Sequence, residues 1–248
     1  MKKSVLMIFV LFVSAFDGAL YAQTKRQSVQ TTSNHDGAKS QLFPVGKTGV
    51  QFPKLTYYKN TEILEKVNRK IDEITSEFGC DEDAPRPKSV YKVKTNVEYL
   101  TKDIFSIYAS ASWFCEGSYP TNDSNISLTF DLKTGMLVEF EDLFQHYVQD
   151  KAEILKIIFA TQLDRSARLV ATGKAKEGTC DGDPGLYSLE HFETDLFAYN
   201  FSSAGLRVQP LWPHVIEACS ERVTVPYIKL KKFAAPDGLL ARVIESTR

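Results

Sequence analysis

Few residues in this chain stand at spacings that support chemistry, and the histidines show this first. None of the four histidines has a partner at a metal-ligand spacing such as H-x-x-x-H; they are His35, His146, His191 and His214. His191-Phe192-Glu193 fits the H-x-E half of a zinc deaminase motif, but the P-C-x-x-C half is missing. Asp181-Gly182-Asp183 resembles the start of a calcium loop, yet its twelfth position would be Phe192 instead of a bidentate glutamate. We therefore expect neither a metal site nor a cofactor.

Two short motifs match those of penicillin-recognising acyl enzymes. Ser89-Val90-Tyr91-Lys92 satisfies S-x-x-K, and Lys133-Thr134-Gly135 satisfies K-T-G. The serine of that motif must open a helix, whereas Ser89 enters an extended run, and the K-T-G segment is a hairpin turn. Acidic groups such as Glu139 and Glu141 could in principle perform acid–base chemistry on a glycosidic bond. They keep open an enzymatic alternative to a binding function: an envelope glycan hydrolase or deacetylase-like enzyme whose carboxylates are assembled in the fold. We otherwise predict no catalytic residues.

Two loops carry the candidate ligand-binding residues. The first follows Cys115 and the second follows the strand predicted over residues 206–209, and the candidates are Glu116, Ser118, Tyr119, Trp212 and His214. These residues place aromatic faces and polar tips beside Gly or Pro, which suits a sugar ring or a protein surface. Trp113 lies on the apolar phase of its strand, so it is either a core residue or a further contact.

The four cysteines, Cys80, Cys115, Cys180 and Cys219, are predicted to form disulfides. An even number of cysteines without a C-x-x-C motif is typical of structural pairing in an oxidising compartment. Pairing neighbours in sequence is one of three connectivities, and the spacing leaves all three open.

The N-terminus indicates export. Lys2 and Lys3 precede an apolar run over residues 5–13, and Ala22 offers a small residue before a cleavage at Gln23. We predict a signal peptide over 1–22, a flexible leader over 23–48 and one domain over 49–248. The product is expected to be periplasmic or secreted, without stable membrane insertion after cleavage. With 30 basic and 31 acidic residues, the formal net charge is -1, which argues against a nucleic-acid partner.

Hydrophobic periodicity predicts an α+β fold, with an antiparallel sheet covered on one face by two main helices in a single domain stapled by disulfides. The predicted helices cover 61–78 and 151–170, with a short helical turn at 141–144. The predicted strands cover 90–99, 105–115, a hairpin over 126–140, and three short segments at 196–201, 206–209 and 222–225.

The hairpin and the segment after it carry a family resemblance. Phe130-Asp131-Leu132-Lys133-Thr134-Gly135, followed by Glu141-Asp142-Leu143-Phe144, resembles the extracytoplasmic domain of unknown function in RsiV-type anti-sigma factors. The same module precedes the catalytic domain of PdaC-type peptidoglycan deacetylases, and the resemblance covers about residues 49–232. Where the family usually shows a Gly-Gly-Ala-His loop, this chain has Glu116-Gly117-Ser118-Tyr119.

The resemblance implies a function in the cell envelope. Some relatives recognise lysozyme and others accompany peptidoglycan chemistry, but this chain matches neither the sigma-binding segment nor the deacetylase domain with its metal ligands. We therefore expect an exported, non-catalytic binding or sensing module. Its expected partner is an envelope component such as peptidoglycan, or a wall-attacking protein such as lysozyme.

Overall fold

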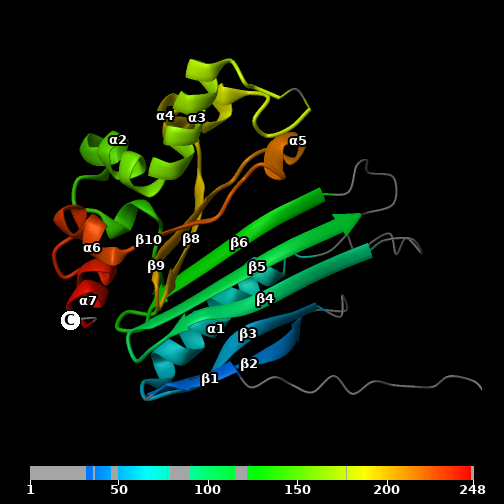
Figure 1. Cartoon of the computed structure of the whole chain (residues 1–248). Coiled ribbons are helices and arrows are strands. Elements are labelled where there is room, and N and C mark those ends of the chain that lie inside the picture. Colours follow the sequence, from blue (N-terminus) through cyan, green and yellow to red (C-terminus); the bar gives the residue numbers. More distant parts are fainter. Residues whose placement is uncertain are drawn as a thin grey trace, which may run out of the picture.

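The computed structural model describes residues 32–35, 37–45, 50–76, 78, 90–114, 122–176 and 178–246. Their elements form three antiparallel sheets, with strand orders β1-β2-β3, β4-β5-β6-β7 and β10-β9-β8, and seven α-helices, which confirms the α+β class (Figure 1). The predicted signal peptide lies outside these ranges. Within them, no helix is both long and apolar enough to cross a membrane.

The elements have the following bounds. The strands are β1 (Thr32–His35), β2 (Ala38–Val45), β3 (Val50–Tyr58), β4 (Val90–Leu100), β5 (Ile104–Phe114), β6 (Asn122–Asp131), β7 (Met136–Leu137), β8 (Phe197–Ser202), β9 (Gly205–Pro210) and β10 (Val223–Val225). The α-helices are α1 (Thr61–Thr75), α2 (Tyr147–Ile158), α3 (Ala160–Thr172), α4 (Leu189–Thr194), α5 (His214–Glu217), α6 (Tyr227–Leu230) and α7 (Leu239–Ser246). Three 3-10 turns complete them, namely η1 (Glu141–Leu143), η2 (Pro184–Tyr187) and η3 (Lys231–Phe233).

Helix α1 forms where the periodicity places it, although it ends at Thr75 rather than at residue 78. The side chain of Asn60 caps it by accepting the N–H groups of Glu62 and Ile63. The amide of Asn68 exchanges two hydrogen bonds with the main chain of Leu55 on β3, at 2.9 and 2.8 Å. These bonds fix the helix against the first sheet.

Strands β1 and β2 occupy part of the segment that composition assigned to a flexible leader. Strand β2 pairs with β3 along its whole length, and the side chains of Ala38 and Ser40 are fully buried. Few apolar residues are needed here because the main-chain ladder of β3 is already in place to receive β2. The ordered part therefore begins earlier than the predicted boundary at residue 49.

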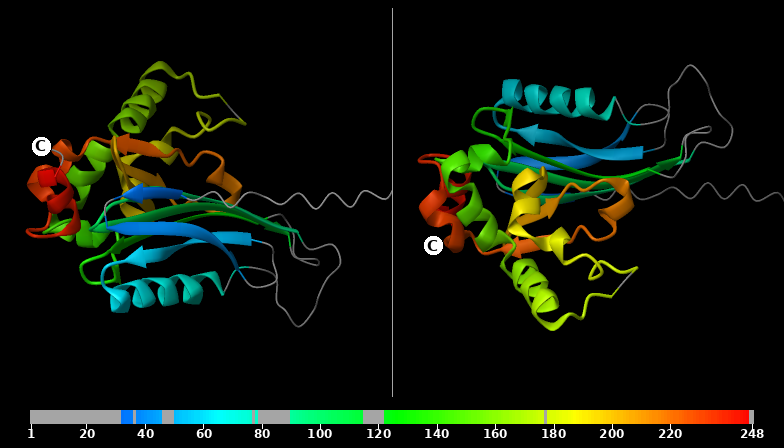
Figure 2. Two further views of the ribbon diagram at one scale, coloured as in Figure 1. Left: turned by 90° about the horizontal axis from the view of Figure 1, so that it is seen from below. Right: turned by 90° about the horizontal axis from the view of Figure 1, so that it is seen from above.

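The β4–β7 sheet is covered on both faces, whereas the sequence indicated one covered face. Phe105, Ile107 and Ala109 of β5 face the core that contains α1 and are fully buried. The alternate residue Ser106 is equally buried, because β8 and β9 lie on the other face. In both views of Figure 2, α1 and the C-terminal elements lie on opposite sides of this sheet.

The second predicted helix, over 151–170, is divided in two at Phe159. This residue has φ -102° and ψ 24°, ends α2 and precedes α3. Its ring is fully buried and stacks on that of Phe192, with the centroids 4.1 Å apart. The ring of Phe159 thus packs in the C-terminal core at the point where the two helices meet.

The β6–β7 hairpin is confirmed. Gly135 has φ +67°, a conformation that a glycine adopts without strain. The carboxylate of Asp131 accepts the N–H of Lys133 at 2.9 Å and pairs with Arg242 of α7 at 2.7 Å. The turn is thus tied to the C-terminal helix.

Candidate functional site

The candidate site includes a β-bulge in β4, at Glu98. The register with β5 shifts between Val97 and Tyr99, which turns the Glu98 side chain toward the C-terminal sheet. One carboxylate oxygen of Glu98 accepts from Arg207 on β9, and the other accepts from Arg222 at 3.2 Å. The Glu98 side chain is only 9% exposed, so this ion pair joins the two sheets from within.

Asn200 of β8 is the centre of a buried polar layer between these sheets. Its Nδ2 donates to the Ser106 hydroxyl at 3.2 Å and to the carbonyl of Ile107 at 2.7 Å. Its Oδ1 accepts from the hydroxyl of Ser127 at 2.7 Å and from Arg222 at 3.0 Å. Because both ends of this fully buried amide are used, Asn200 fixes the position of β8 over β5 and β6.

The polar layer continues outward to a half-buried aromatic stack. The guanidinium of Arg222 lies 4.0 Å from the centroid of the Tyr108 ring. The Tyr108 hydroxyl donates to Asn125 at 2.6 Å, and Asn125 in turn donates to Glu217 of α5 at 3.1 Å. Burial raises the pKa of Tyr108, so its hydroxyl keeps the proton that it donates. Figure 1 shows α5 over the outer half of β6.

Beyond this stack the same face of the sheet is open. Cross-strand partners in an antiparallel sheet share a face, so the pairs Lys92↔Ser112, Lys94↔Ser110 and Asn96↔Tyr108 place their side chains on the side of Arg222. Lys92, Lys94, Asn96 and Ser110 are exposed, and Ser112 is partly exposed. We call these five residues the open polar face.

The two predicted contact loops start near one another. Glu217 contacts Asn125, and Asn125 pairs with Ser110 across the β5–β6 ladder. The last pair before the first loop is Trp113↔Asn122, three residues further out. At about 3.3 Å per residue, the root of that loop lies about 10 Å from the α5 contact. Glu116, Ser118 and Tyr119 themselves lie outside the described residues.

Trp212 is a core residue, which corrects its assignment as an exposed contact. It is 6% exposed, and its ring packs on Tyr187 with the centroids 5.7 Å apart. The indole Nε1 donates to the partly buried Asp195 at 2.6 Å, so its polar end is satisfied within the protein. His214 begins α5, and the structure describes its main chain only.

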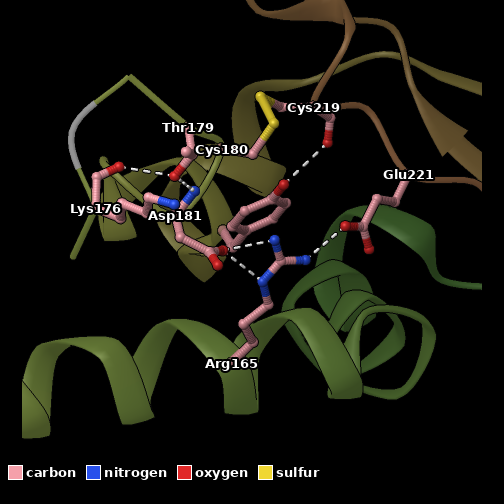
Figure 3. The surroundings of a disulfide bond; sticks show 8 residues. Arg165, Lys176, Thr179, Cys180, Asp181, Cys219 and Glu221 are labelled. Carbon is pink, nitrogen blue, oxygen red and sulfur yellow. Dashed lines mark hydrogen bonds and ion pairs between the residues drawn. A yellow bond between two sulfur atoms is a disulfide. The ribbon is translucent and has the colours of Figure 1, made fainter. Parts of the chain in front are cut away.

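One predicted disulfide is described, between Cys180 and Cys219 (Figure 3). It excludes the two connectivities that pair either cysteine with Cys80 or Cys115, and the latter two lie outside the described ranges. The Arg165 side chain crosses beneath the bond and pairs with Asp181 and Glu221. Asp181 is therefore engaged by a guanidinium, which agrees with a structural turn rather than a calcium loop.

Two largely buried carboxylates, those of Glu98 and Asp195, are engaged by other side chains. Both oxygens of Glu98 accept from arginines, and Asp195 accepts from the Trp212 indole. No group of three or more His, Cys, Asp or Glu side chains in this part of the chain is placed to hold a metal ion. The K-T-G segment is the β6–β7 turn, as the sequence indicated.

A small pocket lies at the other end of the β4–β5 hairpin. It measures about 130 Å³, and its lining includes Tyr99, Asp103 and Arg242. The Arg242 guanidinium is already bound by Asp131 and by the carbonyl of Asp237 at 2.8 Å. Among the described residues its buried Nε has no hydrogen-bond partner, so the guanidinium is engaged at its two terminal nitrogens only.

Sequence reasoning missed Glu98, Tyr108, Asn200 and Arg222. One signal was present in β8, where Asn200 is a polar residue between the large apolar Tyr199 and Phe201. A bulge such as that at Glu98 leaves no comparable mark in the sequence, because it shifts the register by a single residue.

Comparison with known proteins gives fold neighbours only. No family model matches this chain, and neither does any curated protein. Among solved structures it is similar to a DUF3298 family protein from Pseudomonas aeruginosa PAO1, with a TM-score of 0.44, 14% identity, and 81% of this chain and 93% of that chain covered. A DUF3298 member from Bacteroides fragilis NCTC 9343 gives a TM-score of 0.44, 10% identity, and coverage of 84% and 96%. The resemblance to anti-sigma factors and deacetylases stays a prediction.

Proposed function

We propose that this chain is a non-catalytic binding module of the cell envelope, and that its open polar face recognises a wall fragment carrying sugar hydroxyls and carboxylates. The observation that carries the proposal is the Arg222–Tyr108 stack, with Asn125 and Glu217 beside it. It joins the two halves of the molecule at the border of the open polar face, so that residues far apart in sequence form one surface.

The chemistry of this face matches such a fragment. Lys92 and Lys94 alternate on β4, so their attachment points lie about 6.6 Å apart at 3.3 Å per residue. Two ammonium groups at this spacing suit the carboxylates of a wall peptide. The hydroxyls of Ser110 and Ser112 and the amide of Asn96 donate and accept hydrogen bonds, as sugar hydroxyls require.

A protein ligand and a catalytic role are less well supported. Protein interfaces concentrate their binding energy in exposed aromatic and arginine anchors. On the described part of this face, the Tyr108 ring is covered by Arg222, whose guanidinium is held by Glu98 and Asn200. The envelope hydrolase alternative needs a free acid and a free base, and the Glu98 carboxylate is already bound on both sides.

The Cys180–Cys219 disulfide supports a location outside the cytosol. Disulfides persist outside the cytosol, in a periplasm or beyond the cell. Together with the predicted signal peptide, it supports export, which brings the chain to the wall that it is proposed to recognise.

Calorimetric titration tests the proposal. The mature chain is titrated with purified disaccharide-peptide fragments and, separately, with lysozyme. We expect fragment binding that the double variant Lys92→Ala/Lys94→Ala weakens about tenfold, since each exposed ion pair is worth about 0.7 kcal/mol. Lys156→Ala, an exposed lysine on α2, is the matched control and leaves binding unchanged.

Three outcomes contradict the proposal. Binding of lysozyme alone would replace the wall fragment with a protein ligand. Absence of binding to either probe would remove the function, and mass-spectrometric detection of cleaved or deacetylated fragments would establish an enzyme.

A further inference from the structure

The segment from Glu217 to Arg222 carries two residues of the site and is held from behind by a brace. We define the brace as Arg165, Tyr187 and the Cys180–Cys219 disulfide. The Tyr187 hydroxyl donates to the carbonyl of Cys219 at 3.1 Å. Arg165 Nη1 donates to Glu221 at 2.5 Å, so the brace binds the segment at Cys219 and again two residues later (Figure 3).

Arg165 connects three parts of the chain through one guanidinium. Its Nε donates to Asp181, next to Cys180, at 2.6 Å, while its Nη1 reaches Glu221. Its planar group also lies 4.9 Å from the centroid of the Tyr187 ring. A lysine offers a single ammonium point and cannot reproduce this fork. Arg165 therefore holds the disulfide loop and the site segment in one arrangement.

The site residues stand very close to this brace along the chain. Cys219 follows Glu217 by two residues and precedes Arg222 by three. On the far side of the segment, Glu217 is bound by Asn125, and Arg222 stacks on Tyr108. Only two or three residues separate Cys219 from these two contacts, and each residue spans at most about 3.6 Å. We therefore expect a displacement of the Cys219 main chain to displace Glu217 and Arg222 as well.

We propose that Arg165 and the Cys180–Cys219 disulfide are positioning elements for Glu217 and Arg222, which border the open polar face, so that ligand affinity depends on the disulfide. The proposal rests on the proposed function. A dithiol reductant opens the bond: its thiolate attacks one sulfur to form a mixed disulfide, and its second thiol closes on the first. The protein gains two electrons and two protons as two thiols, and the reductant leaves as a cyclic disulfide.

Thermodynamic linkage makes the coupling measurable from both sides. If reduction weakens ligand binding by a given factor, saturating ligand favours the disulfide over the dithiol by the same factor. In a reduced chain that stays folded, a disulfide that only stabilised the fold would show no such dependence on ligand, so circular dichroism of the reduced chain accompanies the measurement.

The test uses the mature chain, dithiothreitol as the reductant and the disaccharide-peptide fragment as the probe. We compare the wild type with Arg165→Met and with Cys180→Ser/Cys219→Ser; Arg168→Met, an exposed arginine on the same helix, is the control. Amide exchange is read over residues 217–222, together with fragment affinity and the reduction equilibrium with and without fragment. We expect faster exchange and about tenfold weaker binding in both brace variants, and a tenfold shift of the reduction equilibrium by fragment.

Unchanged exchange over 217–222 in the brace variants overturns the positioning role, whatever the ligand. Unchanged affinity, or a reduction equilibrium insensitive to fragment, overturns the coupling. If the wild type binds no fragment, the proposed function fails and the coupling fails with it, while the exchange data still decide whether the brace orders the segment.

Discussion

Replacing Asn200 with alanine tests whether the polar layer holds the two sheets together. The side chain is fully buried, and it contributes four hydrogen bonds to groups on three other segments, including Ser106, Ser127 and Arg222. Alanine removes all four and introduces no polar atom in their place. We therefore expect a large fall in the free energy of unfolding, although asparagine is usually a surface residue.

The magnitude follows from the partners. Each of the two Nδ2 bonds, to Ser106 and to the Ile107 carbonyl, is worth about 1 kcal/mol. The two bonds accepted by Oδ1 together add about 1 kcal/mol, because the single hydroxyl proton of Ser127 is shared with the Tyr199 carbonyl and Arg222 is partly exposed. The total is about 3 kcal/mol, which lowers the melting temperature by roughly 6 to 12 °C in a chain of this size.

Urea unfolding of both proteins measures this loss as a shift of the midpoint at constant slope. Asn96→Ala is the matched control, since Asn96 is an exposed asparagine on β4, in the sheet on which β8 packs, and it should change stability by no more than about 0.5 kcal/mol. If Asn200→Ala unfolds within 0.5 kcal/mol of the wild type, about the same range as the control, the layer does not hold the sheets and the reasoning fails.

Three further predictions concern strain, charge and pH. Gly205→Ala should lower the free energy of unfolding by several kcal/mol, because the φ of Gly205 is +148° and a Cβ would lie 2.2 Å from a carbonyl oxygen of β10. The control is Gly178→Ala: the φ of Gly178 is +73°, but no atom lies near its added Cβ, so the loss should be only about 1 kcal/mol. Glu98→Gln should cost about 1 to 2 kcal/mol in urea unfolding, reduced from the fully buried case because its arginine partners are partly exposed, and Glu65→Gln on the exposed face of α1 should cost little. Burial raises the pKa of Tyr199 well above 10.0, so the unfolded chain alone loses this proton above pH 10. This tyrosine alone should then lower the free energy of unfolding by up to about 1.4 kcal/mol per pH unit, in addition to the contributions of partly buried tyrosines such as Tyr108. Tyr199→Phe should therefore reduce the slope without abolishing it, and an equal slope in the variant would contradict the assignment.

Elements stabilised by neighbours in sequence could be predicted. Helix α1 is defined by its cap at Asn60 and by buried Val67 and Ile71 on one face, all within a few turns. The β6–β7 hairpin is likewise set by Asp131 and Gly135, which determine the turn through their own backbone and side-chain bonds. In both cases the residues that determine the element lie inside the predicted segment or next to it.

The covering of the β4–β7 sheet could not be predicted in the same way. Alternation shows that Ser106 and Tyr108 share a face, but it does not show what lies against that face. The strand that buries Ser106 contains Asn200, which is 94 residues away in sequence. Polar residues in alternate positions usually face water, and here the expectation fails because the covering strand brings its own matching donors and acceptors.

The residues that form the candidate site are not those predicted from the sequence, because the members of the site meet through long-range partners, while Glu116, Ser118 and Tyr119 lie outside the described residues. The β5–β6 end and the segment after β9 were chosen from their residue types, and the structure brings them together through Asn125 and Glu217. Trp212 was misassigned because its indole partner, Asp195, lies 17 residues earlier, and no local pattern marks that bond. A tryptophan beside a proline therefore indicates a loop, but its exposure depends on whether the fold supplies an acceptor.

The polar layer also explains why the open polar face lies where it does. Two apolar sheets could slide over one another at small cost, whereas Asn200 and Glu98 accept one register only, because each donor must meet its acceptor. Near Asn200 the layer is fully buried, and by Tyr108 it is half-exposed. Beyond Tyr108 the C-terminal sheet no longer covers β4 and β5, so the same alternation that supplies internal partners presents Lys94 and Ser110 to solvent. One polar face of one sheet is therefore covered over its inner half, where it joins the two sheets, and open over its outer half, where the proposed recognition surface lies.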